Sequence, residues 1–186
     1  MTPLVAIPIR SFSGMARLSD VLDGAARADM IRELASTALA AAAAAGATGA
    51  VVTADPEVAA WASRNEVVVV SDPGTSLDAA ATAGVAFAAG RPWVVLHGDL
   101  PGVQGSDIAA IIGALGDRPV LAPSKDGGTS AVADIAASFP FHFGPGSFQR
   151  HLAVLKGKAR VVVRCGLAVD IDRPADLVAW RVRGRL

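Results

Sequence analysis

The chain has 186 residues, enough for one domain with a sizeable core or for two very small domains. Hydrophobic residues make up 52% of it, and 17 basic side chains balance 17 acidic ones, which excludes a disordered tail and argues against a nucleic-acid-binding surface. The single cysteine, Cys165, excludes a disulfide scaffold and an all-cysteine zinc site, and it suits a reducing compartment.

The N-terminus leads directly into a strand-like segment, without the basic and then apolar pattern of a signal peptide. The longest alanine-rich run, Ala38–Ala45, is far shorter than the ~20 apolar residues that span a bilayer. We therefore expect a cytoplasmic protein with neither a membrane nor nucleic acid as a partner.

Short segments rich in valine and isoleucine predict strands. Their apolar residues are continuous rather than alternating, which is typical of strands that are buried on both faces of a sheet. The predicted strands are Leu4–Ile9, Gly49–Thr53, Val67–Val70, Trp93–His97, Val120–Ala122 and Arg160–Val163.

Runs of good helix formers and helix-start signals predict helices between these strands. Aspartate and serine are favoured N-cap residues, and proline is favoured at the first helical position. We expect helices at Ala26–Ala45, from Pro56 after the cap Asp55, at Leu77–Ala89 after Ser76 or Thr75, at Asp107–Leu115 after Ser106, and at Pro174–Val182.

The alternation of strands and helices predicts an α/β fold, with a mostly parallel mixed sheet flanked by helices. The chain has no linker, charge block or fixed-period repeat, so we expect a single domain over residues 1–186. Two glycine-containing segments, residues 124–130 and 139–148, interrupt the pattern. They are predicted to be long connections, which often carry function.

The first candidate site follows the predicted strand Trp93–His97. Ligands of open α/β sheets bind at the carboxyl ends of the strands, and Asp99 comes directly after such an end. Gly98 lets a ligand approach the backbone there. The alternative is that Asp99 only stabilises a turn with its side chain.

The second candidate site is the Asp170-Ile171-Asp172 segment. If Leu167–Asp172 is extended, both carboxylates point to one face, where they repel each other unless a cation lies between them. Magnesium, which takes oxygen ligands, is the ordinary cation for such a site. The alternative is that Asp172 is the N-cap of the last helix and that Asp170 is a solvated residue.

The third candidate site is the turn from Phe143 to Ser147, just before a helical segment. Glycines and backbone N–H groups at a helix start form an anion site, and Ser147 could act as both N-cap and phosphate ligand. The alternative is a simple turn with a capping serine. The Gly127–Ser130 loop is a weaker phosphate-binding candidate, and it is not a Walker motif.

The remaining polar residues favour structural interpretations. The three histidines, His97, His142 and His151, have no metal-ligand spacing, so packing or surface roles are expected. Cys165 has neither a paired cysteine nor a neighbouring base in the sequence, and we expect it to be structural.

Together these motifs resemble one family, the guanylyltransferases that activate 2-phospho-L-lactate or phosphoenolpyruvate in the synthesis of coenzyme F-420. The resemblance covers nearly the whole chain, and the Phe-Gly-Pro-x-Ser element is its most discriminating part. The other elements recur across nucleotidyltransferases of the GT-A-like fold. The anchors are Gly98-Asp99-Leu100-Pro101, Gly127–Ser130, Phe143-Gly144-Pro145-Gly146-Ser147, and Asp170-Ile171-Asp172 with Pro174, Asp176 and Leu177.

The resemblance implies a Mg²⁺-dependent GT-A-like enzyme that transfers GMP from GTP to the phosphorylated acid and releases pyrophosphate. The oligomeric state, monomer or homodimer, is left open by the sequence. Its site residues would be Asp99, Asp170 and Asp172 for Mg²⁺, Asp99 and Arg17 for catalysis, Ser130, Gly144 and Ser147 for the acceptor, and Pro8, Arg10, Arg17, Asp72, Asp78 and Gly98 for the nucleotide.

Two departures from the family pattern leave other functions open. Met15 stands near the place of a family lysine, and Asp78 stands where the family usually has asparagine. Methionine cannot neutralise a triphosphate, and an ionised carboxylate accepts hydrogen bonds without donating any. The alternatives are an enzyme of the same fold that uses another nucleotide or phospho-acid, such as 3-phosphoglycerate, and a catalytically silent nucleotide-binding relative.

Overall fold

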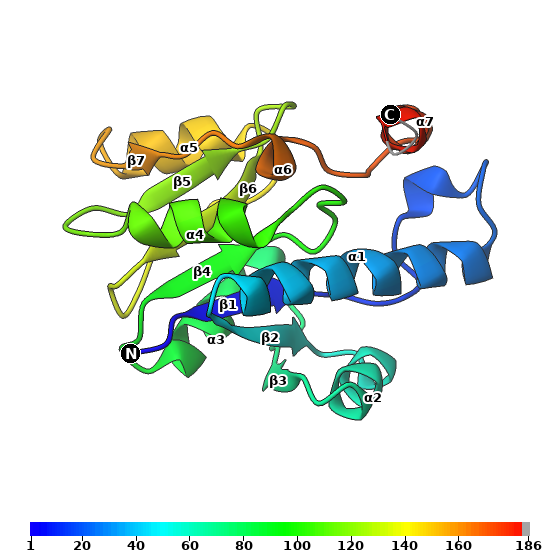
Figure 1. The fold of residues 1–186 in the computed structure, drawn as a ribbon, viewed down its shortest axis with the longest axis horizontal. Coiled ribbons are helices and arrows are strands. Elements are labelled where there is room, and N and C mark those ends of the chain that lie inside the picture. Colours follow the sequence, from blue (N-terminus) through cyan, green and yellow to red (C-terminus); the bar gives the residue numbers. More distant parts are fainter. Residues whose placement is uncertain (184–186) are drawn as a thin grey trace.

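A computed structural model describes residues 1–183 of the chain. Seven strands form one sheet in the order β3-β2-β1-β4-β6-β5-β7 (Figure 1). The strands are β1 (Leu4–Pro8), β2 (Thr48–Thr53), β3 (Val68–Ser71), β4 (Trp93–Leu96), β5 (Val120–Pro123), β6 (Thr129–Asp134) and β7 (Arg160–Val161).

The sheet is mixed, as predicted, with one reversed strand. β1 pairs in parallel with β2 and β4, β3 pairs in parallel with β2, and β7 pairs in parallel with β5. β6 pairs antiparallel with both β4 and β5. All six predicted strands are present, with ends shifted by up to two residues, whereas β6 was not predicted. It lies partly within a segment expected to be a loop.

The helices follow the predicted order. The side chains of Asp23, Asp55 and Ser76 each accept a hydrogen bond from the first turn of α1, α2 and α3. Ser106 is wrong as a cap, because α4 begins earlier, after Gln104. The helices are the 3-10 turn η1 (Ala16–Leu18), α1 (Gly24–Ala44), α2 (Pro56–Arg64), α3 (Leu77–Ala88), α4 (Gly105–Gly113), α5 (Ser147–Val154), α6 (Cys165–Ala168) and α7 (Pro174–Arg183).

The helices cover both faces of the sheet, so that it has two cores. Alternate residues of a strand point to opposite faces. Val5 and Ile7 therefore pack with α1, α2 and α4, whereas Leu4 and Ala6 pack with α3 and the side of α5 (Figure 1). Gly84 of α3 lies so close to the sheet that an added Cβ would be 2.6 Å from the Cβ of Ala6.

The C-terminal helix α7 lies away from the sheet, near η1 and the beginning of α1 (Figure 1). Leu177 of α7 and Ile171 join a small buried cluster with Leu18 of η1 and Leu34 of α1. This cluster brings the Asp170–Asp172 segment back to the edge of the sheet where β1 and β4 end. Among the described residues, no helix combines the length and the apolar character needed to cross a bilayer.

Candidate active site

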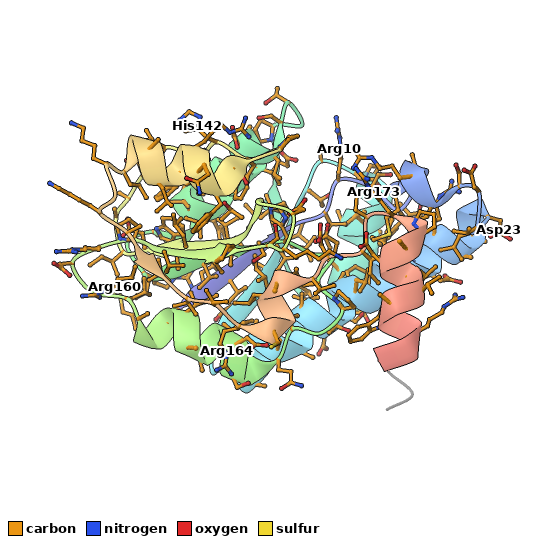
Figure 2. The ribbon with its side chains drawn as sticks, turned by 90° about the horizontal axis from the view of Figure 1, so that it is seen from above. Arg10, Asp23, His142, Arg160, Arg164 and Arg173 are labelled. Carbon is orange, nitrogen blue, oxygen red and sulfur yellow. The ribbon has the colours of Figure 1, made fainter. Side chains whose placement is uncertain are left out.

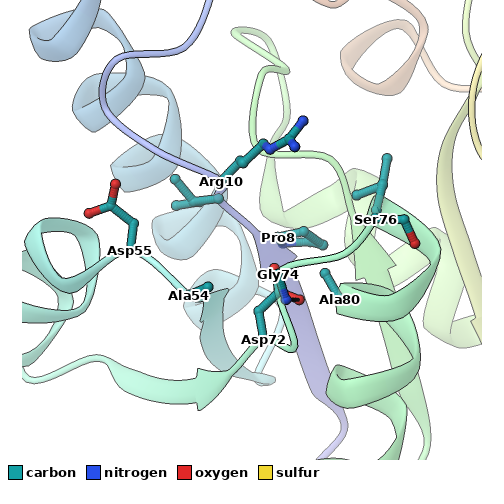
Figure 3. A pocket seen from close by; sticks show the side chains of 10 residues that line it. Pro8, Arg10, Ala54, Asp55, Asp72, Gly74, Ser76 and Ala80 are labelled. Atoms are coloured by element: carbon teal, nitrogen blue, oxygen red, sulfur yellow. Dashed lines mark hydrogen bonds between the residues drawn. The ribbon is translucent and has the colours of Figure 1, made fainter.

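A cavity of about 510 Å³ opens at the carboxyl end of β1, β2 and β3 (Figure 3). Pro8 at the end of β1 and Arg10 just after it border the cavity. Ser76, the cap of α3, borders it together with Leu77 and Ala80 of that helix. Asp72 and Gly74 complete the wall, and the Asp72 Oδ1 atom accepts a hydrogen bond of 2.8 Å from the Gly74 N–H. Cavities of this volume accommodate small organic ligands.

Arg10 is the basic residue of this cavity. Figure 3 shows its guanidinium at the rim, and Figure 2 shows its side chain extended outward from the molecule. The side chain is exposed and forms no ion pair within the part of the chain that the structure describes. The exposed guanidinium is therefore free to meet an anionic group of a bound molecule.

Asp55 also borders this cavity and was predicted only as a helix cap. It is a cap, because its Oδ1 atom accepts hydrogen bonds from the N–H groups of Glu57 and Val58 at 2.8 and 3.2 Å. Its position just after β2 is the sequence signal for a second, ligand-facing role.

A smaller cavity of about 260 Å³ adjoins the first one. Both cavities are lined by Pro8, Ile9, Arg10 and Leu77, and the smaller one extends to His97, Gly98 and Asp99 beyond β4. A Cβ at Gly98 would lie 3.2 Å from the Cγ2 atom of Ile7, so a side chain there would crowd β1. The two cavities together form one depression along the edge of the sheet.

His97, for which the sequence predicted a packing or surface role, also borders the smaller cavity. Its Nε2 atom is buried without a hydrogen-bond partner among the described residues. A buried ring nitrogen without a partner is costly, so a bound polar group would improve its environment. Its place at the end of β4, two residues before Asp99, is the signal that could have found it.

The two segments that carry the three predicted carboxylates lie side by side at this edge. The Ile171 N–H donates a hydrogen bond of 3.0 Å to the Asp99 carbonyl, which brings the Asp170–Asp172 segment alongside Asp99. Ile171 is buried, whereas the residues on either side of it are partly exposed. The alternation expected of an extended segment is present there, but Leu167 and Ala168 belong to α6, so the predicted extension before Val169 is wrong.

The electrostatics of Asp99 are those of a carboxylate that lacks a counter-charge. Burial raises the pKa of Asp99, the charges of Asp170 and Asp172 raise it further, and His97 opposes them. Burial also raises the pKa of Asp170, with Asp126 and Asp176 adding to the effect. The Asp99 Oδ1 atom is enclosed and has no hydrogen-bond partner among the described residues.

These observations fit a divalent cation, because a cation would pair the orphaned oxygen and relieve the repulsion. Arg17 forms an ion pair with Asp172, and its guanidinium supplies part of the positive charge that these carboxylates lack. Across residues 1–183, no group of three or more His, Cys, Asp or Glu side chains is already arranged to hold a metal ion. The Mg²⁺ site at Asp99, Asp170 and Asp172 stays a prediction.

The acceptor residues predicted by resemblance lie on two touching loops. The Phe148 N–H donates to the Gly127 carbonyl at 3.3 Å, which joins the Gly127–Ser130 segment to the Phe143–Ser147 turn. Gly144 has a φ of 110°, a conformation that favours glycine. The turn is exposed from Gly144 to Gly146, so it presents its backbone to solvent.

Both predicted acceptor serines are buried, and both use their hydroxyl groups internally. The Ser147 Oγ–H donates to the Thr129 Oγ1 atom at 3.2 Å, and the Ser130 Oγ–H donates to the Ala122 carbonyl at 3.2 Å. Ser147 is wrong as an N-cap, because Gly146 is the N-cap and Ser147 is the first helical residue. The Ser147 contact joins the turn to the start of β6, and the Ser130 contact joins β6 to β5.

His151 completes this network beneath the turn. Its Nε2 atom accepts a hydrogen bond of 2.9 Å from the His142 N–H, so the ring proton lies on Nδ1 and is donated to Thr129 Oγ1 at 3.0 Å. His151 is fully buried, and burial lowers its pKa to about 4. It is a neutral structural residue, as expected.

Asp78 does not border either cavity, although the resemblance placed it with the nucleotide. Its Oδ1 atom instead accepts a hydrogen bond from the Phe143 N–H at 2.8 Å. Met15 does line the smaller cavity, in a left-handed conformation with φ 54°. An apolar side chain therefore lines this cavity near the position at which the resemblance implies a lysine.

Known proteins are similar to this chain over nearly its whole length. Residues 3–185 match the family described as CofC-like guanylyl transferases. The chain is 36% identical to a phosphoenolpyruvate guanylyltransferase from Chloroflexus aggregans, over 90% of this chain and 91% of that one. It is 28% identical to a 2-phospho-L-lactate guanylyltransferase from Methanosphaerula palustris, over 99% and 86% of the two chains.

The fold also matches a solved structure. A nucleotide-diphospho-sugar transferase candidate from Desulfovibrio desulfuricans G20 superposes with a TM-score of 0.83, over 98% of this chain and 88% of that one. The sequence identity is 16%, so this likeness concerns the fold alone.

Proposed function

The chain belongs to the CofC-like guanylyl transferase family and is thus a nucleotidyltransferase, and we propose that it transfers GMP from GTP to phosphoenolpyruvate or 2-phospho-L-lactate. An oxygen of the acceptor phosphate attacks the α-phosphorus of GTP and forms a new P–O–P bond. The bond from the α-phosphorus to the bridging oxygen breaks, and pyrophosphate leaves. As the family resemblance implies, the product belongs to coenzyme F-420 biosynthesis.

The larger cavity is the proposed site of the guanosine. Its volume and its mixed wall of Pro8, Leu77 and Asp72 suit a base and ribose, whose ring atoms are apolar on their faces and polar on their edges. Arg10 lies where this cavity continues into the smaller one, and its free guanidinium suits the phosphates that extend from the ribose.

The smaller cavity is the proposed site of the reacting phosphates, because it leads to Asp99. Asp99, Asp170 and Asp172 would hold Mg²⁺ through their carboxylate oxygens, as the orphaned Oδ1 atom and the raised pKa values of Asp99 and Asp170 support. When bound, Mg²⁺ supplies neutralisation of the charge that develops on the phosphate oxygens.

Arg17 is proposed to act on the same phosphates. Its side chain is 67% exposed and its partner Asp172 is 42% exposed, so the ion pair between them is weak in water. A bound triphosphate carries more negative charge than one carboxylate and would attract the guanidinium away from Asp172. Arg10 and Arg17 together would then cover the β- and γ-phosphates.

The acceptor is proposed to lie against the turn from Phe143 to Ser147. The Ser147 and Ser130 hydroxyls are engaged internally, so the exposed backbone of Gly144 and Gly146 is the better ligand for an anionic group. Little acid–base chemistry is required, because a phosphate dianion is already nucleophilic at neutral pH. The protein contributes placement and charge neutralisation.

The observation that carries this proposal is the continuity of the two cavities with the orphaned carboxylate of Asp99. The experiment is to incubate the protein with Mg²⁺ and each of the four ribonucleoside triphosphates, and to measure pyrophosphate release. Phosphoenolpyruvate, 2-phospho-L-lactate and 3-phosphoglycerate are compared as acceptors. We expect release only with GTP and one of the first two acids, and release with another pair would replace the proposed substrates.

Met15 favours a second candidate function, a nucleotide-binding relative without catalysis. Methionine in the smaller cavity cannot neutralise a phosphate as lysine does. GTP binding with Mg²⁺ and no pyrophosphate release from any acceptor would support this function. A Met15→Lys variant that gains activity would show that the missing charge is the cause.

A further inference from the structure

The carboxylate of Asp78 joins two elements that are 65 residues apart in the sequence. Asp78 lies in the first turn of α3, and its Oδ1 atom accepts a hydrogen bond of 2.8 Å from the Phe143 N–H. On the same helix, Ser76, Leu77 and Ala80 border the larger cavity and Asp78 does not. The side chain therefore contacts the acceptor turn and not the proposed nucleotide site.

Phe143 is held on its other backbone group as well. The Arg150 Nη2–H donates a hydrogen bond of 2.8 Å to the Phe143 carbonyl. The Phe143 ring packs 5.0 Å from the His97 ring and 5.2 Å from the His151 ring, measured between centroids. The backbone N–H, the backbone carbonyl and the side chain of Phe143 are thus all held by contacts.

Fixing Phe143 determines what the turn presents to a ligand. A trans peptide is planar, and its C=O and N–H groups point in opposite directions. Because Arg150 holds the Phe143 carbonyl, the Gly144 N–H of the same peptide points away from Arg150. Asp78 fixes the preceding peptide in the same way through its N–H. The orientation of the Gly144 N–H therefore depends on both contacts.

We infer that Asp78 is a positioning residue for the acceptor, which acts through the Phe143–Gly144 turn, and that it does not read the nucleotide. This inference rests on the proposed function, since it takes the turn as the acceptor site. It differs from the role implied by the resemblance, which placed Asp78 with the nucleotide. The chemical requirement at position 78 is a hydrogen-bond acceptor, which both Asp and Asn provide.

The test compares Asp78→Ala with Asp78→Asn. The alanine variant leaves the Phe143 N–H without its acceptor, whereas asparagine can still accept through its Oδ1 atom. Loss of one such hydrogen bond changes an equilibrium by about tenfold. For the alanine variant we expect the KM for phosphoenolpyruvate to rise by about tenfold, while the KM for GTP changes by less than about twofold. For the asparagine variant we expect both values near those of the wild type.

Two further variants separate positioning from general damage. Arg150→Met removes the contact to the Phe143 carbonyl, and we expect it to raise the KM for phosphoenolpyruvate selectively. Asp72→Ala is the matched control on the nucleotide side, because Asp72 borders the larger cavity and its carboxylate accepts a hydrogen bond from the nearby Gly74 N–H. We expect it to raise the KM for GTP selectively. Thermal unfolding of each variant verifies that it is folded.

The outcomes are distinct. A rise in the KM for GTP in Asp78→Ala without a rise for phosphoenolpyruvate would overturn the inference, as would equal rises or no change. Calorimetric titration of phosphoenolpyruvate with Mg²⁺ into each variant gives the same comparison without turnover. If the wild type binds phosphoenolpyruvate or 2-phospho-L-lactate but releases no pyrophosphate with either acid, the proposed function fails, and titration with the acid that binds still decides the role of Asp78. If the wild type binds neither acid, both the proposed function and the inference fail.

Discussion

The neutral state of buried His151 predicts a loss of stability in mild acid. In the folded protein its Nε2 atom accepts the His142 N–H, so a proton there would face another donor. Burial, together with His142, Arg150 and His97, lowers the pKa of His151 to about 4, and Asp78 opposes them only in part. In the unfolded chain the ring has its ordinary pKa of about 6.5.

The sign and size follow from linkage between protonation and folding. Below pH 6.5 His151 is protonated in the unfolded state, whereas in the folded state it stays neutral until the pH nears 4. The free energy of unfolding therefore falls as the pH falls from 6.5 to 4. The two pKa values give a loss of about 2 kcal/mol at pH 5 and about 3 kcal/mol at pH 4, relative to neutral pH. Typical domains have 5–15 kcal/mol in total, so the loss is large.

The assay is denaturant unfolding of the wild type and of His151→Phe between pH 7.5 and pH 4. Phenylalanine does not titrate, so the variant lacks this contribution while all other titrating groups are shared. The variant is less stable at neutral pH, because Thr129 and the His142 N–H lose a partner. We expect its deficit to shrink by about 3 kcal/mol at pH 4. Parallel stability curves for the two proteins would refute the reasoning.

Three further predictions concern packing, charge and metal. Gly84→Ala places a Cβ 2.6 Å from the Cβ of Ala6 and should lower the free energy of unfolding by about 1–3 kcal/mol. The control Gly113→Ala places a Cβ that meets nothing within 4 Å and should not lower it. Thermal unfolding of the two variants measures the difference. Arg10→Ala should raise the KM for GTP by about tenfold to a hundredfold and leave that for the acceptor nearly unchanged in steady-state kinetics. Chelation with EDTA should stop pyrophosphate release, and excess Mg²⁺ should restore it; release that persists in EDTA would exclude the metal.

Much of the sheet was predictable because its strands are buried on both faces. Continuous valine and isoleucine segments such as Val51–Thr53 have few other stable arrangements. β6 was missed because Thr129–Asp134 is made of small and polar residues. Its antiparallel direction follows from the short connection after β5, where Asp126-Gly127 is a turn signal typical of hairpins.

The place of Asp99 was predictable from a general rule, since it follows the carboxyl end of β4. The Asp170–Asp172 segment follows the short helix α6 and reaches this edge through the hydrogen bond from Ile171 to Asp99. The direction in which a side chain points was not predictable. Ser147 points inward to Thr129, and Asp78 points to Phe143 rather than to the cavity, because tertiary contacts decide these rotamers. Sequence spacing carries no information on such contacts.

The most direct test of the account measures pyrophosphate release by the wild type and by Asp99→Asn, with GTP, Mg²⁺ and phosphoenolpyruvate or 2-phospho-L-lactate. Asparagine has the shape of aspartate and removes a buried charge, so the variant should unfold at a temperature no lower than the wild type. We expect it to release pyrophosphate at least a hundredfold more slowly, about the loss that follows removal of one electrostatic group from an active site. Undiminished release by a folded Asp99→Asn protein would contradict the proposed chemistry.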